Sequence, residues 1–295
     1  MAETTKQWTI LDILRWTTDF FREKAIDNPR LTAEVLLAHT LQKDRMYLYV
    51  HFDQPLYEDE RAGFRALIKQ RVQGVPTQYL VGTQEFWSLE FKVTPDVLIP
   101  RPETEHLVEA AINLSKEFPA PAIVDIGTGS GIIAVSLKKE LPQAAVHAAD
   151  ISERALAIAQ QNAAVLLDGD SAIIFHQGDL FTPLYGHTFD LIISNPPYIA
   201  AADYAELARE VKDHEPRMAL HAGEKGLDVY ERLIADAQNY LNPGGYVLVE
   251  IGYGQKDDVV KIFEEHGYSI HDVIPDYAGI ERVVVGQRPI PNLDS

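Results

Sequence analysis

Apolar residues in the first 85 positions recur about every 3.6 residues, the period of a helix with one buried face. Three segments show this pattern: residues 10–21, residues 31–41 after Pro29, and residues 57–73, where Gly74 and Pro76 end it. Short amphipathic helices bury their apolar faces against one another. The pattern therefore predicts a small helical bundle, which we assign to residues 1–80.

The spacing changes after residue 79, where polar and apolar positions alternate as in a strand with one buried face. We interpret residues 81–100 as a β-hairpin that links two domains. Beyond Pro121, short apolar runs alternate with helical patterns. The expected strands are 122–126, 145–149, 172–175, 189–194 and 245–251, and the helices between or after them are 132–140, 152–167, 227–241 and 257–266.

Strands that alternate with helices pair in parallel through right-handed crossovers, with helices on both faces of the sheet. The predicted fold class is therefore α/β: a Rossmann-like, doubly wound sheet over residues 101–290, preceded by the helical bundle and the hairpin. In such sheets the ligand lies beyond the carboxyl ends of the strands.

Charge is divided unevenly between these two parts. The chain has 26 Lys and Arg against 44 Asp and Glu, a formal net charge of -18. Residues 1–85 hold 11 basic and 12 acidic side chains, whereas residues 86–295 hold 15 and 32, a net of -17. Nucleic-acid binding depends largely on cationic side chains that neutralise phosphates. The acidity disfavours a duplex DNA or RNA partner, and its location indicates two bodies with different roles.

The chain contains no cysteine, which excludes disulfides, thiolate metal sites and cysteine nucleophiles. Its first ten residues lack a basic stretch followed by an apolar one, and no window holds the roughly 18 apolar residues that a membrane span needs. We expect a cytoplasmic protein without a membrane partner.

A glycine-rich segment, Asp125-Ile-Gly127-Thr128-Gly129-Ser130-Gly131, stands between a predicted strand and a predicted helix. Three alternate glycines allow a sharp turn and let a ligand approach the backbone closely. The spacing is neither that of a dinucleotide-binding loop nor that of a phosphate loop. A nucleoside cofactor without a pyrophosphate fits this spacing better.

Two acids follow the next strands. Asp150, at the end of the second strand, could accept hydrogen bonds from both hydroxyls of a ribose, or it could cap the helix that begins at Ser152. Asp179, followed by Leu180, comes after the third strand, where it could receive an adenine amino group or cap a turn.

Directly after the fourth strand stands Asn195-Pro196-Pro197-Tyr198. Two prolines fix φ and remove two backbone donors, so the Pro196 carbonyl can project without an intrachain partner. This carbonyl and the Asn195 side-chain oxygen make two fixed acceptors for the hydrogens of one NH2 group. Tyr198 offers a flat face for a planar amide or base.

Together, residues 125–131 and 195–198 resemble an S-adenosylmethionine-dependent class I methyltransferase that acts on planar NH2 groups. That pair of motifs is shared by adenine-N6 DNA enzymes and glutamine-N5 protein enzymes. Other segments resemble the HemK-type peptide chain release factor glutamine methyltransferases over almost the whole chain; they are residues 36–39, 74–82, 85–86, 97–105 and 281–284.

The resemblance implies methylation of the glutamine in the Gly-Gly-Gln loop of class 1 release factors, with S-adenosyl-L-homocysteine as the second product and no metal. It implies a cofactor site at Gly127, Thr128, Gly129, Ser130, Gly131, Asp150, Asp179, Leu180 and Asn195. It places substrate binding at Asn195, Pro196, Pro197 and Tyr198, and catalysis at Asn195, Pro196 and Tyr198. Several members of the family carry a tryptophan where this chain has Leu180.

Two alternatives use the same chemistry. A glutamine methyltransferase that acts on a ribosomal protein is close in sequence. An adenine-N6 nucleic-acid methyltransferase shares both motifs but needs a cationic groove, and the acidic C-terminal part offers none. A non-catalytic cofactor-binding protein would have no need for the Asn-Pro-Pro-Tyr motif.

Overall fold

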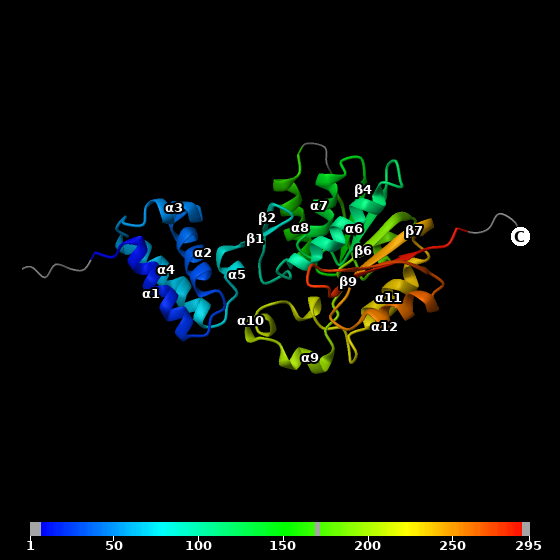
Figure 1. Cartoon of the computed structure of the whole chain (residues 1–295). Coiled ribbons are helices and arrows are strands. Elements are labelled where there is room, and N and C mark those ends of the chain that lie inside the picture. Colours follow the sequence, from blue (N-terminus) through cyan, green and yellow to red (C-terminus); the bar gives the residue numbers. More distant parts are fainter. Residues whose placement is uncertain (1–6, 169–171, 291–295) are drawn as a thin grey trace, which may run out of the picture. The chain divides into compact units, whose positions relative to one another are not determined.

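The computed structural model describes residues 7–168 and 172–290, and the chain divides into two compact units (Figure 1). The helical unit comprises Met1–Gly82 together with Ala208–His214, and the sheet unit comprises Thr83–Leu207 and Glu215–Ser295. The hairpin thus belongs to the sheet unit. A short segment from the second half of the chain belongs to the helical unit, which the sequence pattern did not indicate.

The helical unit is built around α1, α2 and α4, which confirms the three predicted helices. Thr9 and Asp12 form a capping box that begins α1, and Pro29 occupies the first turn of α2. Two further short helices, α3 and α5, were not predicted. The bounds are α1 (Ile10–Glu23), α2 (Pro29–Leu41), α3 (Arg45–Val50), α4 (Glu58–Val72) and α5 (Thr77–Val81).

Buried side chains from α1, α2 and α4, among them Phe21, Leu36 and Phe64, form the core of the helical unit. The later segment adds α10 (Arg209–Lys212), whose Glu210 forms an ion pair at 2.5 Å with the buried Arg71 of α4. Within residues 7–168 and 172–290, none of the helices has both the length and the apolar character needed to cross a bilayer.

The sheet unit contains a two-stranded hairpin and a seven-stranded sheet of order β5-β4-β3-β6-β7-β9-β8. The first five strands of that order are parallel, which confirms the predicted α/β class, and β9 and β8 extend the sheet in antiparallel pairing. The strands are β1 (Thr83–Phe86), β2 (Leu89–Lys92), β3 (Ala122–Ile126), β4 (Ala145–Asp150), β5 (Ile174–Gln177), β6 (Phe189–Ser194), β7 (Leu241–Glu250), β8 (Ser269–Pro275) and β9 (Glu281–Gln287).

Two predictions of individual elements were wrong, and two strands were missed. The third strand lies two residues later than expected, at residues 174–177. The helix expected to end at Leu241 ends at Ala237, and Leu241 begins β7. Strands β8 and β9 were not predicted. The remaining helices of the sheet unit are η1 (Pro102–Thr104), α6 (Glu105–Ser115), α7 (Ile132–Glu140), α8 (Glu153–Leu166), η2 (Thr182–Leu184), α9 (Ala201–Glu206), η3 (Arg217–Ala219), α11 (Asp228–Ala237) and α12 (Lys256–Glu265).

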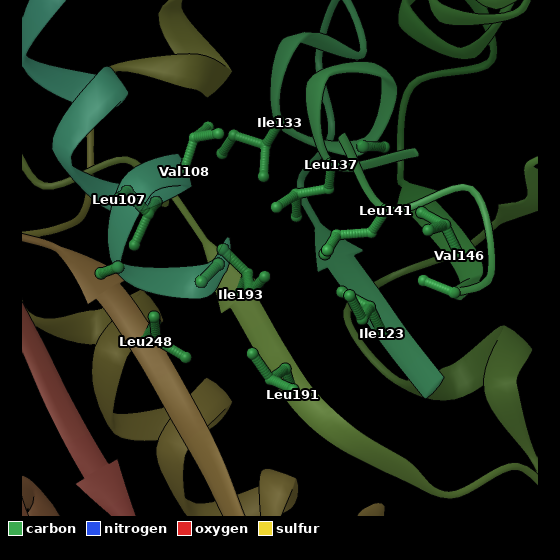
Figure 2. Packing of buried hydrophobic residues seen from close by; sticks show 14 of the residues in the cluster. Leu107, Val108, Ile123, Ile133, Leu137, Leu141, Val146, Leu191, Ile193 and Leu248 are labelled. Carbon is green, nitrogen blue, oxygen red and sulfur yellow. The ribbon is translucent and has the colours of Figure 1, made fainter. Parts of the chain in front are cut away.

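Successive residues of the central strands enter two separate apolar clusters, as period-two geometry requires. Leu191 and Ile193 of β6 pack with residues of α6 and α7 on one face, as Figure 2 shows. Ile192 of the same strand packs on the opposite face with residues of α11 and α12. Helices therefore cover both faces, which explains why these strands read as continuous apolar runs.

Leu191 offers a direct test of this packing. Its side chain is fully buried beside Ile123, so Leu191→Ala should lower the free energy of unfolding by roughly 2–5 kcal/mol because it leaves a cavity. Urea unfolding followed by circular dichroism measures the change. The control is Val165→Ala on the outer face of α8, where the side chain is 82% exposed and the expected change is within about 0.5 kcal/mol. Equal effects of the two substitutions would contradict the assigned core.

Candidate active site

The polar residues singled out from the sequence gather where neighbouring parallel strands end. Strand β3 pairs with β4 on one side and β6 on the other, so the loops after Ile126, Asp150 and Ser194 leave the same edge of the sheet. Ser194 donates a hydrogen bond from its hydroxyl to the carbonyl of Ile126 at 2.7 Å and ties two of these ends together. The structure thus brings the glycine loop, Asp150 and the Asn-Pro-Pro-Tyr segment to one edge.

The glycine loop has a conformation that L side chains rarely adopt. Gly127, Gly129 and Gly131 have φ of +74°, +56° and +84°, all in the left-handed region. A Cβ added at Gly127 would meet no protein atom within 4 Å, whereas one at Gly131 would lie 3.0 Å from the Cβ of Ala159. Gly131 therefore permits close packing of α7 on α8, and Gly127 leaves space open beside the loop.

Other residues hold this loop in place. Thr128 and Ser130 are buried between the glycines. Asn162 of α8 donates from Nδ2 to the carbonyl of Ser130 at 2.8 Å, and its Oδ1 accepts from the backbone N–H of Lys92 at 2.8 Å. One buried amide therefore links the glycine loop, α8 and the hairpin strand β2.

Asp125 lies beneath the loop and is fully buried. Its Oδ2 accepts from the Thr128 hydroxyl at 2.6 Å and from the N–H of Ala134 at 3.2 Å. Its Oδ1 is buried and has no hydrogen-bond partner among the described residues. Burial raises the pKa of this carboxyl to about 7, with the charge of Asp150 acting in the same direction.

Asp150 closes the other side of the loop. One carboxylate oxygen accepts from the backbone N–H of Gly129 at 2.8 Å, and the other accepts from that of Ser152, also at 2.8 Å. Burial raises the pKa of Asp150, and the hydrogen bonds from the backbone amides oppose that rise. The Ser152 hydroxyl caps α8 by accepting from Ala155, so that helix has a cap besides Asp150.

Asp179 and Leu180 follow β5. The Asp179 carboxylate forms an ion pair with Arg232 at 2.5 Å, and its carbonyl accepts from the N–H of Thr182 in a turn. Leu180 has a positive φ of +49° and packs against the apolar cluster that also contains Phe181. The Asp179 backbone thus closes a turn, and its side chain is paired with a cation.

The Asn-Pro-Pro-Tyr segment is held from several sides. Asn195 donates from Nδ2 to the hydroxyl of Thr104 at 3.1 Å. The carbonyl of Tyr198 accepts from Nε2 of Gln255 at 3.0 Å. A Cβ on Gly226 would come within 2.3 Å of that carbonyl, so only glycine fits there. Burial raises the pKa of Tyr198 to about 12, helped by the negative charge of Glu250.

Sequence reasoning missed three residues of this site: Thr104, Glu250 and Gln255. Glu250 ends β7, is 2% exposed, and its Oε2 accepts from the Thr104 hydroxyl at 2.6 Å. The Asn195 side chain also acts to lower the pKa of this carboxyl. The sequence did hold a sign of Glu250, because this acid stands at the carboxyl end of an apolar strand. Burial of an acid there costs desolvation free energy, and such a residue often has a role in binding or catalysis.

Two other features lie apart from this edge. A hollow of about 570 Å³ is lined by residues of α12, β8 and β9, among them Val260 and Ile270, and includes none of the predicted site residues. Within the two described ranges, no cluster of three or more His, Asp or Glu side chains is arranged to hold a metal ion.

Two family models match the chain. Residues 12–82 match the PrmC N-terminal domain, and residues 104–213 match the Methyltransferase small domain. A solved methyltransferase from Pyrococcus furiosus superimposes with a TM-score of 0.52 at 19% identity, covering 77% of this chain and 98% of that one. The fold and the glycine loop therefore define a class I methyltransferase.

Two relatives extend the likeness to nearly the full chain. The release factor glutamine methyltransferase of Geobacter sulfurreducens is 46% identical over 97% of this chain and 99% of its own length. That of Rhodopirellula baltica is 44% identical over 98% of this chain and all of its own. The chain belongs to the release factor glutamine methyltransferase family.

The burial of Glu250 predicts a dependence of stability on pH. Burial raises its pKa from 4.5 to about 7. The folded state therefore binds this proton more tightly than the unfolded state, and stability is lost as the pH rises from about 4.5 to 7. Glu250→Gln removes that loss, so the free energy of unfolding of the variant relative to the parent should increase by up to about 3 kcal/mol between pH 5 and pH 8.

Urea titrations of both proteins at several pH values measure this difference. Glu265→Gln, on the exposed end of α12, is the control and should show a change below about 0.5 kcal/mol. A difference between parent and Glu250→Gln that does not vary with pH would contradict the raised pKa.

Proposed function

We propose that this protein transfers a methyl group from S-adenosyl-L-methionine to the side-chain amide nitrogen (N5) of the glutamine in the Gly-Gly-Gln loop of class 1 peptide chain release factors, in the cytoplasm. The observation that carries the proposal is the Asn195 amide, which Thr104 holds by a hydrogen bond and which the buried Pro196 follows. It lies at the edge of the sheet where the glycine loop also begins. Membership of the family over nearly the whole chain supports the choice of substrate.

The residues present fit the cofactor. Open space beside Gly127 admits a ligand against the backbone, and Asp125 keeps one buried oxygen without a partner among the described residues. Asp150, held by two backbone amides, would bind the ribose hydroxyls. Gly129 and Gly131, with Thr128 and Ser130, would complete the cradle, and Asp179 and Leu180 would lie toward the adenine. When bound, S-adenosylmethionine supplies an electrophilic methyl group on a positively charged sulfur.

The substrate amide is a poor nucleophile, because its nitrogen lone pair is delocalised into the carbonyl. The protein must therefore hold the NH2 group in one orientation and stabilise the positive charge that develops on nitrogen. The Asn195 oxygen and the Pro196 carbonyl would accept its two hydrogens, which is the reverse of an oxyanion hole. Pro197 would keep the segment rigid, and Tyr198 would lie against the planar amide.

The charge of the sheet unit favours a protein substrate over DNA. Residues 86–295 carry a net of -17, and an acidic surface repels the phosphates that a nucleic-acid methyltransferase must neutralise. An uncharged glutamine on a protein loop meets no such repulsion.

The helical unit is proposed to recognise the body of the release factor. It has its own core and a nearly balanced charge, and Arg65 and Lys69 are exposed on α4. Arg61, on the same helix, is partly buried and pairs with Glu58, so the exposed basic face of α4 consists mainly of Arg65 and Lys69.

Transfer of labelled methyl groups tests the proposed function. Offered with labelled cofactor, the parent protein should label a class 1 release factor and neither DNA nor a release factor whose loop Gln is replaced by Ala. Asn195→Ala should reduce turnover on the order of 10²-fold, since it removes one preorganised polar group.

Matched variants separate cofactor binding from turnover. Asp150→Asn should weaken cofactor binding by about tenfold or more in calorimetry, since a charge-assisted hydrogen bond contributes about 1.5–3 kcal/mol. Asp257→Asn, a 94% exposed acid on α12, should change neither quantity.

In the labelling experiment, label on DNA, or equal label on the Gln→Ala release factor, would overturn the proposal.

Charge reversal on α4 tests the role of the helical unit. Arg65→Glu combined with Lys69→Glu should raise KM for the release factor by about threefold to tenfold, because rim charges mainly affect encounter, and should leave the cofactor Kd unchanged. Lys261→Glu, on the exposed surface of α12, is the control with an expected change below twofold. Equal loss of release-factor and cofactor binding would argue against this role.

A further inference from the structure

A chain of three buried or half-buried side chains runs behind the site: Asn195, Thr104 and Glu250. The β6–β7 register pairs Ser194 with Val249, so Asn195 and Glu250 stand side by side at the ends of two adjacent strands. Thr104, fully buried in η1, lies between their polar ends and hydrogen-bonds both. None of these contacts builds the sheet or the helices, because each joins side chains only.

We infer that Glu250, acting through Thr104, is a positioning residue that decides which end of the Asn195 amide faces the substrate. The inference rests on the proposed function, in which the Asn195 oxygen accepts from the substrate NH2 group. It assigns a role to an acid whose burial is otherwise unexplained.

Hydrogen-bond donors and acceptors fix the orientation of the Asn195 amide. An ionised carboxylate can only accept hydrogen bonds, so the Thr104 hydroxyl must donate its single hydrogen to Glu250. The Thr104 oxygen can then only accept from Asn195, which requires the NH2 end of the Asn195 amide to point toward Thr104. The carbonyl end is therefore left to accept from a substrate. A reversed amide would set two acceptors against each other and present NH2 to NH2.

Protonation of Glu250 removes this constraint. A neutral carboxyl can donate to the Thr104 oxygen, which frees the hydroxyl hydrogen for the Asn195 oxygen and permits the reversed amide. The ionised form is disfavoured by burial and by Glu103 of η1. It is favoured by the Thr104 hydroxyl, by Arg282 of β9 and by the Asn195 side chain.

Two tyrosines complete the surroundings of Glu250. Tyr230 of α11 donates to its backbone carbonyl at 2.8 Å, and the hydroxyl of Tyr198 lies within its electrostatic reach. Burial holds the pKa of both phenols above 10, so neither tyrosine ionises in the range where Glu250 does.

Two substitutions at Thr104 form a matched pair. Thr104→Val keeps the shape and removes the hydroxyl, whereas Thr104→Ser keeps the hydroxyl and removes one methyl group. Thr104→Val should lower kcat for release-factor methylation by about 10-fold to 10²-fold, because a misoriented group loses most of its effect. Thr104→Ser should stay within about threefold of the parent. The cofactor Kd should be unchanged within about twofold in both.

The pH profile adds a readout that a purely structural role would not alter. The kcat of the parent should fall as the pH is lowered through the pKa of Glu250, near 7. Glu250→Gln and Thr104→Val should lose this dependence as well as activity, since charge no longer orients the amide. A normal kcat in Thr104→Val, or an unchanged pH profile in Glu250→Gln, would overturn the inference.

An NMR measurement that does not depend on methyl transfer tests this inference separately from the proposed function. In ¹⁵N-asparagine-labelled protein, the side-chain NH2 signal that disappears in Asn195→Ala should titrate with Glu250 in the parent and in Thr104→Ser, and not in Thr104→Val. If the NH2 signal titrates but the protein does not methylate the release factor, the proposed substrate is refuted and the positioning role is not. An Asn195 side-chain NH2 chemical shift that does not change with pH in the parent would refute the positioning role.

Discussion

The parallel pairing of β3 with β4 and β6 determines where the glycine loop, Asp150 and Asn195 lie. Parallel strands run in one direction, so their carboxyl ends and the loops that follow meet at a single edge. Both faces of these strands are buried under helices, and polar side chains can only collect at the ends. The glycine loop, Asp150 and Asn195 are far apart in sequence, and the register of three strands alone makes them neighbours.

The same arrangement buries acids. Asp125 and Glu250 each have a pKa raised to about 7 because helices and strands exclude water from the ends of β3 and β7. A buried carboxyl that is half ionised near neutral pH lowers stability relative to an apolar residue. Both acids receive hydrogen bonds from a threonine, Thr128 and Thr104 respectively, which offsets part of that cost. A buried carboxylate is therefore best explained by a function of its charge, such as the orientation of a neighbouring polar side chain.

The sequence predicted those parts of the fold that are determined by patterns within a short stretch of the chain. Strand β3, the glycine turn and α7 were expected within a residue of their bounds, because an apolar run, three glycines and a helical period adjoin one another. Strand β8 was missed, since it lies at the edge of the sheet with mixed burial and so lacks a continuous apolar run. The contact of Thr104 with Glu250 spans 146 residues, and no local pattern encodes it.

Hydrogen-bond polarity also bears on why the proposed substrate is an amide. In the proposed site, the Asn195 oxygen and the Pro196 carbonyl would be two fixed acceptors and would match a group with two donor hydrogens. A glutamate side chain in the same place would set its carboxylate oxygens against those acceptors, and a site built to bind NH2 rejects an analogue that lacks it by several powers of ten. That discrimination depends on the Asn195 oxygen facing the substrate. If Glu250 positions Asn195 as inferred, its carboxylate would, through one threonine hydroxyl, contribute to the choice between glutamine and glutamate without touching either.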